Sequence, residues 1–299
     1  MKKTISILSI TLTFVLLAST IFYSRYQDFI SAPRITNTEH IAVAAGESAS
    51  KIAYQFIPYS LENKLYLRLL FKQHPEFLAV RQGTFATQAG WSFITLFEHL
   101  VTGTEVQHKI TFIEGSTFKE WLEQIARAPE LVNDIAEMSE TELLSELQID
   151  SPKLEGMLLP ETFFYPTKSN ASDILRAASS ELREYLAQAW AKRAKNLPLK
   201  TPYEALILAS IIEKETSLEA ERKTVASVFI NRLNKRMKLQ TDPTVIYGLG
   251  ERYKGDIKRK HLREKTAYNT YVIRGLPPTP IAMVGKNAID AALNPAKTK

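Results

Sequence analysis

The sequence predicts an α+β protein with mixed helices and strands, and three observations predict this class. An uncharged apolar stretch lies near the N-terminus. Strand-like stretches at 40–52, 84–96 and 109–121 each lead through a glycine into a helical pattern. Beyond residue 130, apolar residues recur mainly at helical spacing. A chain of 299 residues is long enough for one large or two modest folded domains, and we expect a boundary near residue 108.

The first expected element is a membrane anchor. The stretch from Thr4 to Tyr23 has no charged residue, and a helix of that length, at about 1.5 Å per residue, crosses roughly 30 Å of hydrocarbon. Lys2 and Lys3 favour keeping the N-terminus in the cytoplasm. A cleavable signal peptide is the alternative, but the run is longer than a usual signal core and no good A-x-A site follows it. We therefore expect residues 1–30 to form a cytoplasmic tip and a single transmembrane helix.

The three strand-like segments share one spacing. Each contains a glycine, a hydroxyl residue two positions later and a large apolar residue four positions after that. A glycine turn, a hydroxyl N-cap and an apolar helical face explain this spacing as a repeated strand–turn–helix unit. The three sets are Gly46, Ser48 and Ile52; Gly90, Ser92 and Leu96; and Gly115, Thr117 and Trp121.

The next stretch is expected to be helical and carries no evident chemistry. Residues Glu140 to Leu147 form an acidic amphipathic segment. A long helix is expected from Ala171 to Ala194, because its apolar residues recur at helical spacing. The inward residues of that helix are Ile174, Leu175, Leu182 and Leu186.

The residue that attracts most attention is Glu215. The stretch from Ala205 to Ile212 is apolar on nearly every face, which is typical of a helix buried in a core. Helical spacing places Glu215 in line with Leu208, Ile211 and Ile212, whereas Glu213 continues a stripe of smaller residues. A carboxyl group held against apolar surface has a raised pKa and can donate a proton to a leaving group. This is the chemistry of glycosidic bond cleavage.

Two considerations oppose this interpretation of Glu215. Thr216 and Glu219 have the spacing of a capping box, so a second helix is expected to start directly after Glu215, and its positive end would favour the ionised carboxylate. A run of charges at a helix end is also commonly solvated. The sequence leaves both alternatives open.

Polar residues that could orient a sugar follow this second helix. The Asp242–Pro243 step is expected to hold the chain extended and to break any helix. Gln240, Thr241 and Asp242 offer hydrogen-bonding groups, and Tyr247 could stack on an apolar sugar face. An ordinary capped turn is the alternative.

Four long motifs occur in order: ASIIEKET, ERKTVASVFINRL, LQTDPTVIYG and TAYNTYVIRGLPP. Together with EGMLLPETFFYP, they resemble the endolytic murein transglycosylases of the MltG/YceG family. The resemblance implies a small LysM-like subdomain at 31–108, which would bind N-acetylated glycans, and a mixed helix and strand YceG-like catalytic domain at 109–299. It also implies that Glu215 is the catalytic acid.

The implied reaction needs one carboxylate, whereas ordinary glycosidases need two. The 6-hydroxyl of N-acetylmuramic acid attacks its own C1 and closes a 1,6-anhydro ring, with Glu215 acting first as acid and then as base. Glu161 is a weaker candidate for steering charge. If Glu161 lies within about 5.5 Å of Glu215, a retaining hydrolase becomes the alternative. Our candidates for holding the glycan are Gln240, Thr241, Asp242, Tyr247, Tyr268 and Asn269.

The chain departs from the family pattern in two places. The family usually continues past N-P-A-K-T into a strand segment and a final helix, whereas this chain ends at Lys299, so we expect a catalytic domain that is short at its C-terminus. Thr279 stands where the family often has glycine. The alternative function is therefore a catalytically impaired, membrane-anchored protein that binds glycan or acts as a scaffold in cell-wall synthesis.

Composition limits the partners. The net charge of +6 could suggest nucleic acid, but the basic runs lack interleaved aromatic residues, so we expect no nucleic-acid partner. The chain has no cysteine, no H-E-x-x-H motif and no P-loop, so neither a cofactor nor a metal is expected. The expected partners are peptidoglycan strands, the inner membrane and peptidoglycan synthases (penicillin-binding proteins), with the catalytic domain in the periplasm.

Overall fold

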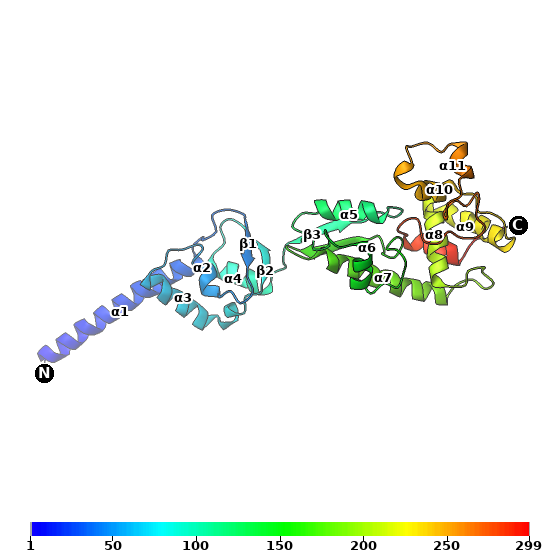
Figure 1. The fold of residues 1–299 in the computed structure, drawn as a ribbon. Coiled ribbons are helices and arrows are strands. Elements are labelled where there is room, and N and C mark those ends of the chain that lie inside the picture. Colours follow the sequence, from blue (N-terminus) through cyan, green and yellow to red (C-terminus); the bar gives the residue numbers. More distant parts are fainter. Residues whose placement is uncertain (1, 299) are drawn as a thin grey trace. The chain divides into compact units, whose positions relative to one another are not determined.

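The computed structural model describes residues 2–298, with side chains from residue 9 onward (Figure 1). The chain divides into two compact units, one ending at Gln107 and the other beginning at His108. We call these unit 1 and unit 2.

Unit 1 begins with helix α1 (Lys2–Ser31). The N-terminal part of α1 carries exposed apolar side chains, whereas Tyr26, Phe29 and Ile30 are buried in the core of unit 1. The first predicted segment ends at residue 30. In the structure, the last turns of α1 pack into the same core as the elements that follow.

The predicted transmembrane span, Thr4 to Tyr23, remains a prediction. Throughout the part of the chain that the structure describes, we find no helix with both the length and the apolar character needed to cross a membrane. Residues 4–8 of the predicted span lie outside the described side chains.

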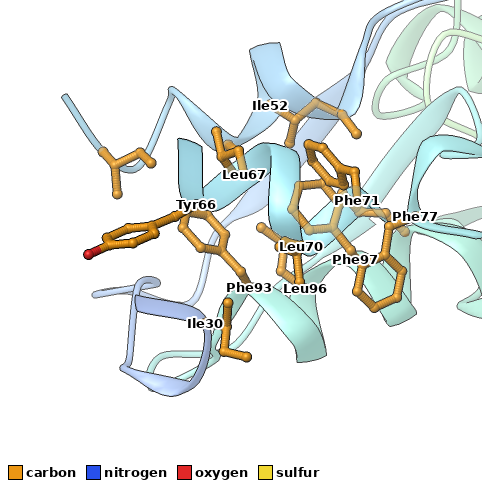
Figure 2. Close-up of a cluster of buried hydrophobic side chains, with 14 of the residues drawn as sticks. Ile30, Ile52, Tyr66, Leu67, Leu70, Phe71, Phe77, Phe93, Leu96 and Phe97 are labelled. Carbon is orange, nitrogen blue, oxygen red and sulfur yellow. The ribbon is translucent and has the colours of Figure 1, made fainter. Parts of the chain in front are cut away.

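The rest of unit 1 is a two-stranded sheet with helices. Strands β1 (His40–Val43) and β2 (Gly83–Ala86) pair antiparallel, with Val43 opposite Gly83. Between them lie α2 (Ala49–Ala53), α3 (Leu61–Gln73) and the 3-10 helix η1 (Pro75–Leu78), and α4 (Phe93–Thr102) follows β2. Figure 2 shows the core that joins them, in which rings of α3, η1 and α4 meet around Phe97.

The repeated strand–turn–helix unit is confirmed. The three glycines, Gly46, Gly90 and Gly115, all have positive φ, between 72° and 91°. In each turn the predicted hydroxyl is the N-cap and accepts a hydrogen bond from a backbone N–H in the first helical turn. The apolar residue of each unit is completely buried. Local sequence chemistry therefore determines these turns.

The first half of unit 2 contains the third strand–turn–helix unit, formed by β3 (Gln107–Thr111) and α5 (Phe118–Arg127). Strand β3 shares a two-stranded sheet with β4 (Thr162–Pro166). Helices α6 (Glu140–Glu146) and α7 (Ala171–Ala191) complete this half, close to their predicted ranges. Trp121 stacks on Phe112 in a core that also includes the inner face of α7.

The second half of unit 2 is built around α8 (Pro202–Glu215). Every residue of α8 from Ala205 to Glu213 is buried, which confirms the predicted core helix. Helix α8 is in contact with α7, α9 (Glu219–Asn234), α10 (Asp242–Leu249) and α12 (Lys286–Leu293) (Figure 1). The short helices η2 (Gly250–Arg252) and α11 (Arg259–Arg263) lie in the long connection before α12.

Two local predictions in this half are wrong. Thr216 does not cap α9: it is the C-cap of α8, and α9 begins only at Glu219. The positive end of α9 therefore does not directly follow Glu215. The Asp242–Pro243 step does not break a helix but begins α10, because proline is well accommodated in the first helical turn, where its missing N–H is not needed.

Candidate active site

The last turn of α8 separates its two acids. Glu213 is only 8% exposed, whereas Glu215 is exposed. Helical spacing predicts apolar surroundings for Glu215, but in the structure it is Glu213 that lies in them. Helical spacing shows which residues share a face, but it does not show which of them are covered by other segments and which are exposed to water.

Glu213 is held by a buried ion pair. One of its oxygens accepts a hydrogen bond from Arg222 Nη2 at 2.6 Å, and the other accepts one from the backbone N–H of Gly285 at 3.0 Å. Arg222 also reaches Glu114 at 3.3 Å. Burial raises the pKa of Glu213, and the Gly285 N–H and the Arg222 guanidinium oppose the rise. These contacts make Glu213 a structural residue that is fully engaged within the protein.

Two distant segments fix the end of α8. Lys214 Nζ donates to the carbonyl of Gly115 at 3.0 Å, and the N–H of Gly115 donates to the carbonyl of Met283 at 2.8 Å. Gly285 lies so close to Glu114 that an added Cβ would come within 1.8 Å of its carboxylate oxygen. The turn after β3 and the segment before α12 therefore clamp the helix end that carries Glu215.

Among the described residues, Glu215 has one hydrogen-bond partner, which is itself buried. Thr241, which is buried, donates from its hydroxyl to Glu215 Oε2 at 2.8 Å. The backbone N–H of Thr241 donates to the hydroxyl of Thr270 at 3.1 Å, and the hydroxyls of Thr270 and Thr244 lie 2.8 Å apart. This buried hydroxyl cluster supports Thr241, which holds one oxygen of the exposed Glu215.

A second acid and a tyrosine lie beside this carboxylate. The Tyr271 hydroxyl donates to Asp242 Oδ1 at 2.7 Å. That hydrogen bond, burial and the charges of Asp242 and Glu215 raise the pKa of Tyr271 to about 12, with Arg232 opposing the rise. Because Asp242 follows Thr241, which holds Glu215, Tyr271 borders the same site. Tyr271 lies in the motif T-A-Y-N-T-Y, from which only Tyr268 and Asn269 are predicted as site residues.

Gln240 also borders the site. Its backbone has φ of 50°, an uncommon value for a residue with a side chain, and its N–H donates to the carbonyl of Thr270 at 3.2 Å. The side chain of Gln240 is exposed. The strained backbone places this amide where a bound glycan could reach it.

Tyr247 and Tyr268 form an aromatic pair with ring centroids 4.9 Å apart. Lys153 Nζ lies 5.7 Å and 5.8 Å from the two ring centroids. Burial and the neighbouring Glu155 raise the pKa of Tyr247, and burial raises the pKa of Glu155 to about 7. The Tyr268 hydroxyl lies 2.8 Å from the hydroxyl of Thr279, so the residue that departs from the family pattern supports this pair.

The remaining two candidates contact other parts of unit 2. The Asn269 side chain is buried, and its amide nitrogen donates to the carbonyls of His261 and Glu264 at 3.0 and 2.7 Å. Both of its amide protons are therefore used within the protein. Glu161 pairs with Lys286 at 2.6 Å, and the contacts that hold Glu161 share no residue with those that hold Glu215.

Comparison with known proteins is consistent with this geometry. The chain is 32% identical over 234 residues to a Bacillus subtilis protein named endolytic murein transglycosylase, a match that covers 72% of this chain and 64% of that protein. It is 31% identical over 154 residues to a Streptococcus pneumoniae protein of the same name, covering 49% of this chain and 27% of that protein. The chain thus spans less than two thirds of the length of these curated relatives.

A solved structure and a family comparison extend the match. The crystal structure of a YceG-like protein from Listeria monocytogenes has a TM-score of 0.51 and 27% identity, and the match covers 88% of this chain and 91% of that one. The pattern of the YceG-like family matches residues 41–299, which include most of unit 1 and all the candidate site residues. The chain therefore belongs to the YceG-like family.

Proposed function

We propose that unit 2 is an endolytic peptidoglycan transglycosylase, a lyase that cuts the MurNAc–GlcNAc bond within glycan strands and leaves 1,6-anhydro ends. One observation carries the proposal: Glu215 is an exposed carboxylate at the end of a buried, clamped helix, with Thr241 fixing one oxygen. The names of the relatives support the same reaction.

The reaction needs a group that protonates the glycosidic oxygen and then accepts the proton of the attacking 6-hydroxyl. Glu215 performs both steps with the oxygen that Thr241 leaves free. Because the nucleophile belongs to the sugar, no second carboxylate has to activate water, and the attack is intramolecular. Bound sugar would also cover Glu215 and exclude water from it.

A hydrolase is the second candidate, and Tyr271 is the observation that favours it. Asp242 lies near enough to Glu215 for both charges to act on the same phenol, so Asp242 could direct a water molecule. In that case the products would have reducing ends instead of anhydro ends.

The test is digestion of purified glycan strands followed by mass analysis of their termini. The transglycosylase predicts anhydro-ended fragments from the intact protein and none from Glu215→Gln. Fragments with reducing ends would refute the transglycosylase and support the hydrolase. No new ends at all, combined with retained glycan binding, would leave a glycan-binding or scaffold protein.

Membrane attachment through α1 is part of the proposal. The apolar side chains Ile10, Leu12, Phe14, Leu16 and Leu17 are 59% to 71% exposed, and burying such surface is favourable by about 25 cal/mol per Å². We further propose a location at the inner membrane and a role in ending strand elongation beside penicillin-binding proteins. Flotation of the full chain with phospholipid vesicles tests the attachment, and recovery of the protein only in the unbound fraction would refute it.

For unit 1 we propose a LysM-like glycan-binding role. The supporting observation is the order β1, α2, α3, β2 with the two strands paired antiparallel. Titrating the full-length Glu215→Gln protein with N-acetylglucosamine oligomers should change the fluorescence of Trp91, which lies in unit 1. A response that survives in Trp91→Phe would place the binding elsewhere.

A further inference from the structure

A polar groove runs along one side of α12, outside the contacts that hold Glu215. It consists of two adjoining cavities of about 340 and 620 Å³, and Lys223 and Asp290 line both. The smaller cavity extends toward the end of α7, where Lys192 lies. The larger one extends toward the first turn of α9, where Glu219 and Arg222 lie.

The groove carries charges of both signs. The side chains of Lys192 and Lys223 are exposed and have no ion-pair partner among the described residues. Burial and the neighbouring Asp290 raise the pKa of Tyr185, and Glu219 begins α9. The acids of the groove repel a simple polyanion, and the lysines of the groove repel a simple cation. It suits a ligand that carries both carboxylates and amines.

Arg222 gives an independent indication of a ligand. Its side chain is 7% exposed, and its Nη2 serves Glu213 and Glu114. Its Nε is buried and has no hydrogen-bond partner within the described part of the chain, although Arg222 lines the larger cavity. A buried donor without a partner is costly, so an acceptor that enters the groove would gain from meeting it.

Two contacts link the lining of the groove to the end of α8 that carries Glu215. Thr216, the residue after Glu215, donates its hydroxyl to Glu221 at 3.2 Å, and Glu221 precedes Arg222. Glu213, two residues before Glu215, is the ion-pair partner of Arg222. The residues of the groove and the Glu215 carboxylate are thus held by the same turn of chain between α8 and α9.

We propose that this groove binds the charged peptide carried by the muramic acid residue of the glycan strand. The proposal rests on the proposed function, since it assigns the groove to a second part of the same substrate. The ammonium groups of Lys192 and Lys223 bind the carboxylates of the peptide. Asp290 and Glu219 face its free amine, and Asn287 and Asn294 offer amides to its backbone.

The test measures binding instead of cleavage, with the full-length Glu215→Gln protein. Two soluble probes are titrated by calorimetry: the GlcNAc–MurNAc disaccharide with its pentapeptide, and the same disaccharide after removal of the peptide. We expect the peptide-bearing probe to bind about tenfold more tightly, and Lys223→Ala in the same background to abolish most of that difference. Lys195→Ala is the matched control, because Lys195 is exposed nearby but does not line the groove.

Equal affinities for the two probes, or an unchanged difference in Lys223→Ala, would overturn the proposal. A loss of the same size in Lys195→Ala would also overturn it, because general charge would then explain the preference. The outcome is independent of catalysis. If the protein prefers the peptide-bearing probe but never cuts glycan, the groove still binds peptide and the proposed transglycosylase function is refuted. Conversely, if the protein cuts glycan but shows no preference for the peptide-bearing probe, the transglycosylase function stands and peptide binding in the groove is refuted.

Discussion

The buried and exposed faces of the last turn of α8 differ more than their sequence suggests. Glu213 is enclosed by Arg222 and the N–H of Gly285, and every contact it makes is with the protein. Glu215 is exposed, and within the described part of the chain its hydrogen-bond partner is Thr241. The difference teaches that the acid on the buried face determines stability and the acid on the exposed face is available for chemistry. The predictions below test this separation.

The largest effect is expected on the buried face. Arg222→Met leaves the Glu213 carboxylate buried without its counter-charge, which should lower the free energy of unfolding by about 3–5 kcal/mol. Thermal unfolding of the full chain measures this loss. The double variant Glu213→Gln, Arg222→Met should recover part of it, since no uncompensated charge remains. A double variant no more stable than Arg222→Met would show that the charge is not the cause.

A pH-dependent effect is expected from Glu155, which is 6% exposed. Burial raises its pKa from 4.5 to about 7, so its contribution to stability is complete below pH 4.5 and is lost as the pH rises through 7. The loss amounts to about 3 kcal/mol above pH 8. Unfolding measured between pH 4.5 and pH 8.5 should show a smaller pH-dependent decrease in Glu155→Gln than in the unaltered protein. Parallel profiles would contradict this role.

On the exposed face, Thr241→Val removes the hydroxyl that holds Glu215. Loss of one charge-assisted hydrogen bond should lower kcat about tenfold, with a stability loss of about 1 kcal/mol. Thr241→Ser keeps the hydroxyl and serves as the matched control. Steady-state cleavage of glycan strands measures both variants. If Thr241→Ser loses as much activity as Thr241→Val, the hydrogen bond is not what matters.

The smallest effect is expected from Tyr271→Phe, which removes the hydrogen bond to Asp242 at the edge of the site. We expect a change in kcat/KM of about fivefold or less, because the bond is partly solvated and does not contact Glu215. Tyr268→Phe is the control, since it removes a comparable bond to Thr279. A loss of more than a hundredfold in Tyr271→Phe would make Tyr271 a direct participant.

Features set by neighbouring residues could be predicted from the sequence. The positive φ of Gly46, Gly90 and Gly115 and the hydroxyl caps that follow them are local, so spacing alone revealed them. The burial of α8 could also be predicted, because its apolar residues cover nearly every face of the helix.

The surroundings of the acids could not be predicted in the same way. Gly115 and Gly285, which enclose the end of α8, lie about 100 residues before it and about 70 after it, and helical spacing carries no information about them. The hydroxyl cluster beneath Glu215 depends on Thr270, and the neighbouring acid depends on Tyr271. Both residues lie in a recognised motif, but only the fold shows which side chains of that motif face the site.

The most direct test of the separation uses two variants, Glu215→Gln and Glu213→Gln, measured for both melting temperature and release of anhydro-ended fragments. Glu215→Gln should melt like the unaltered protein and lose about 10²–10⁴-fold in cleavage rate. Glu213→Gln should melt at a lower temperature and, below that temperature, still cut strands. Cleavage that persists in Glu215→Gln, with a lowered melting temperature instead, would contradict the assignment of Glu215 as the acid.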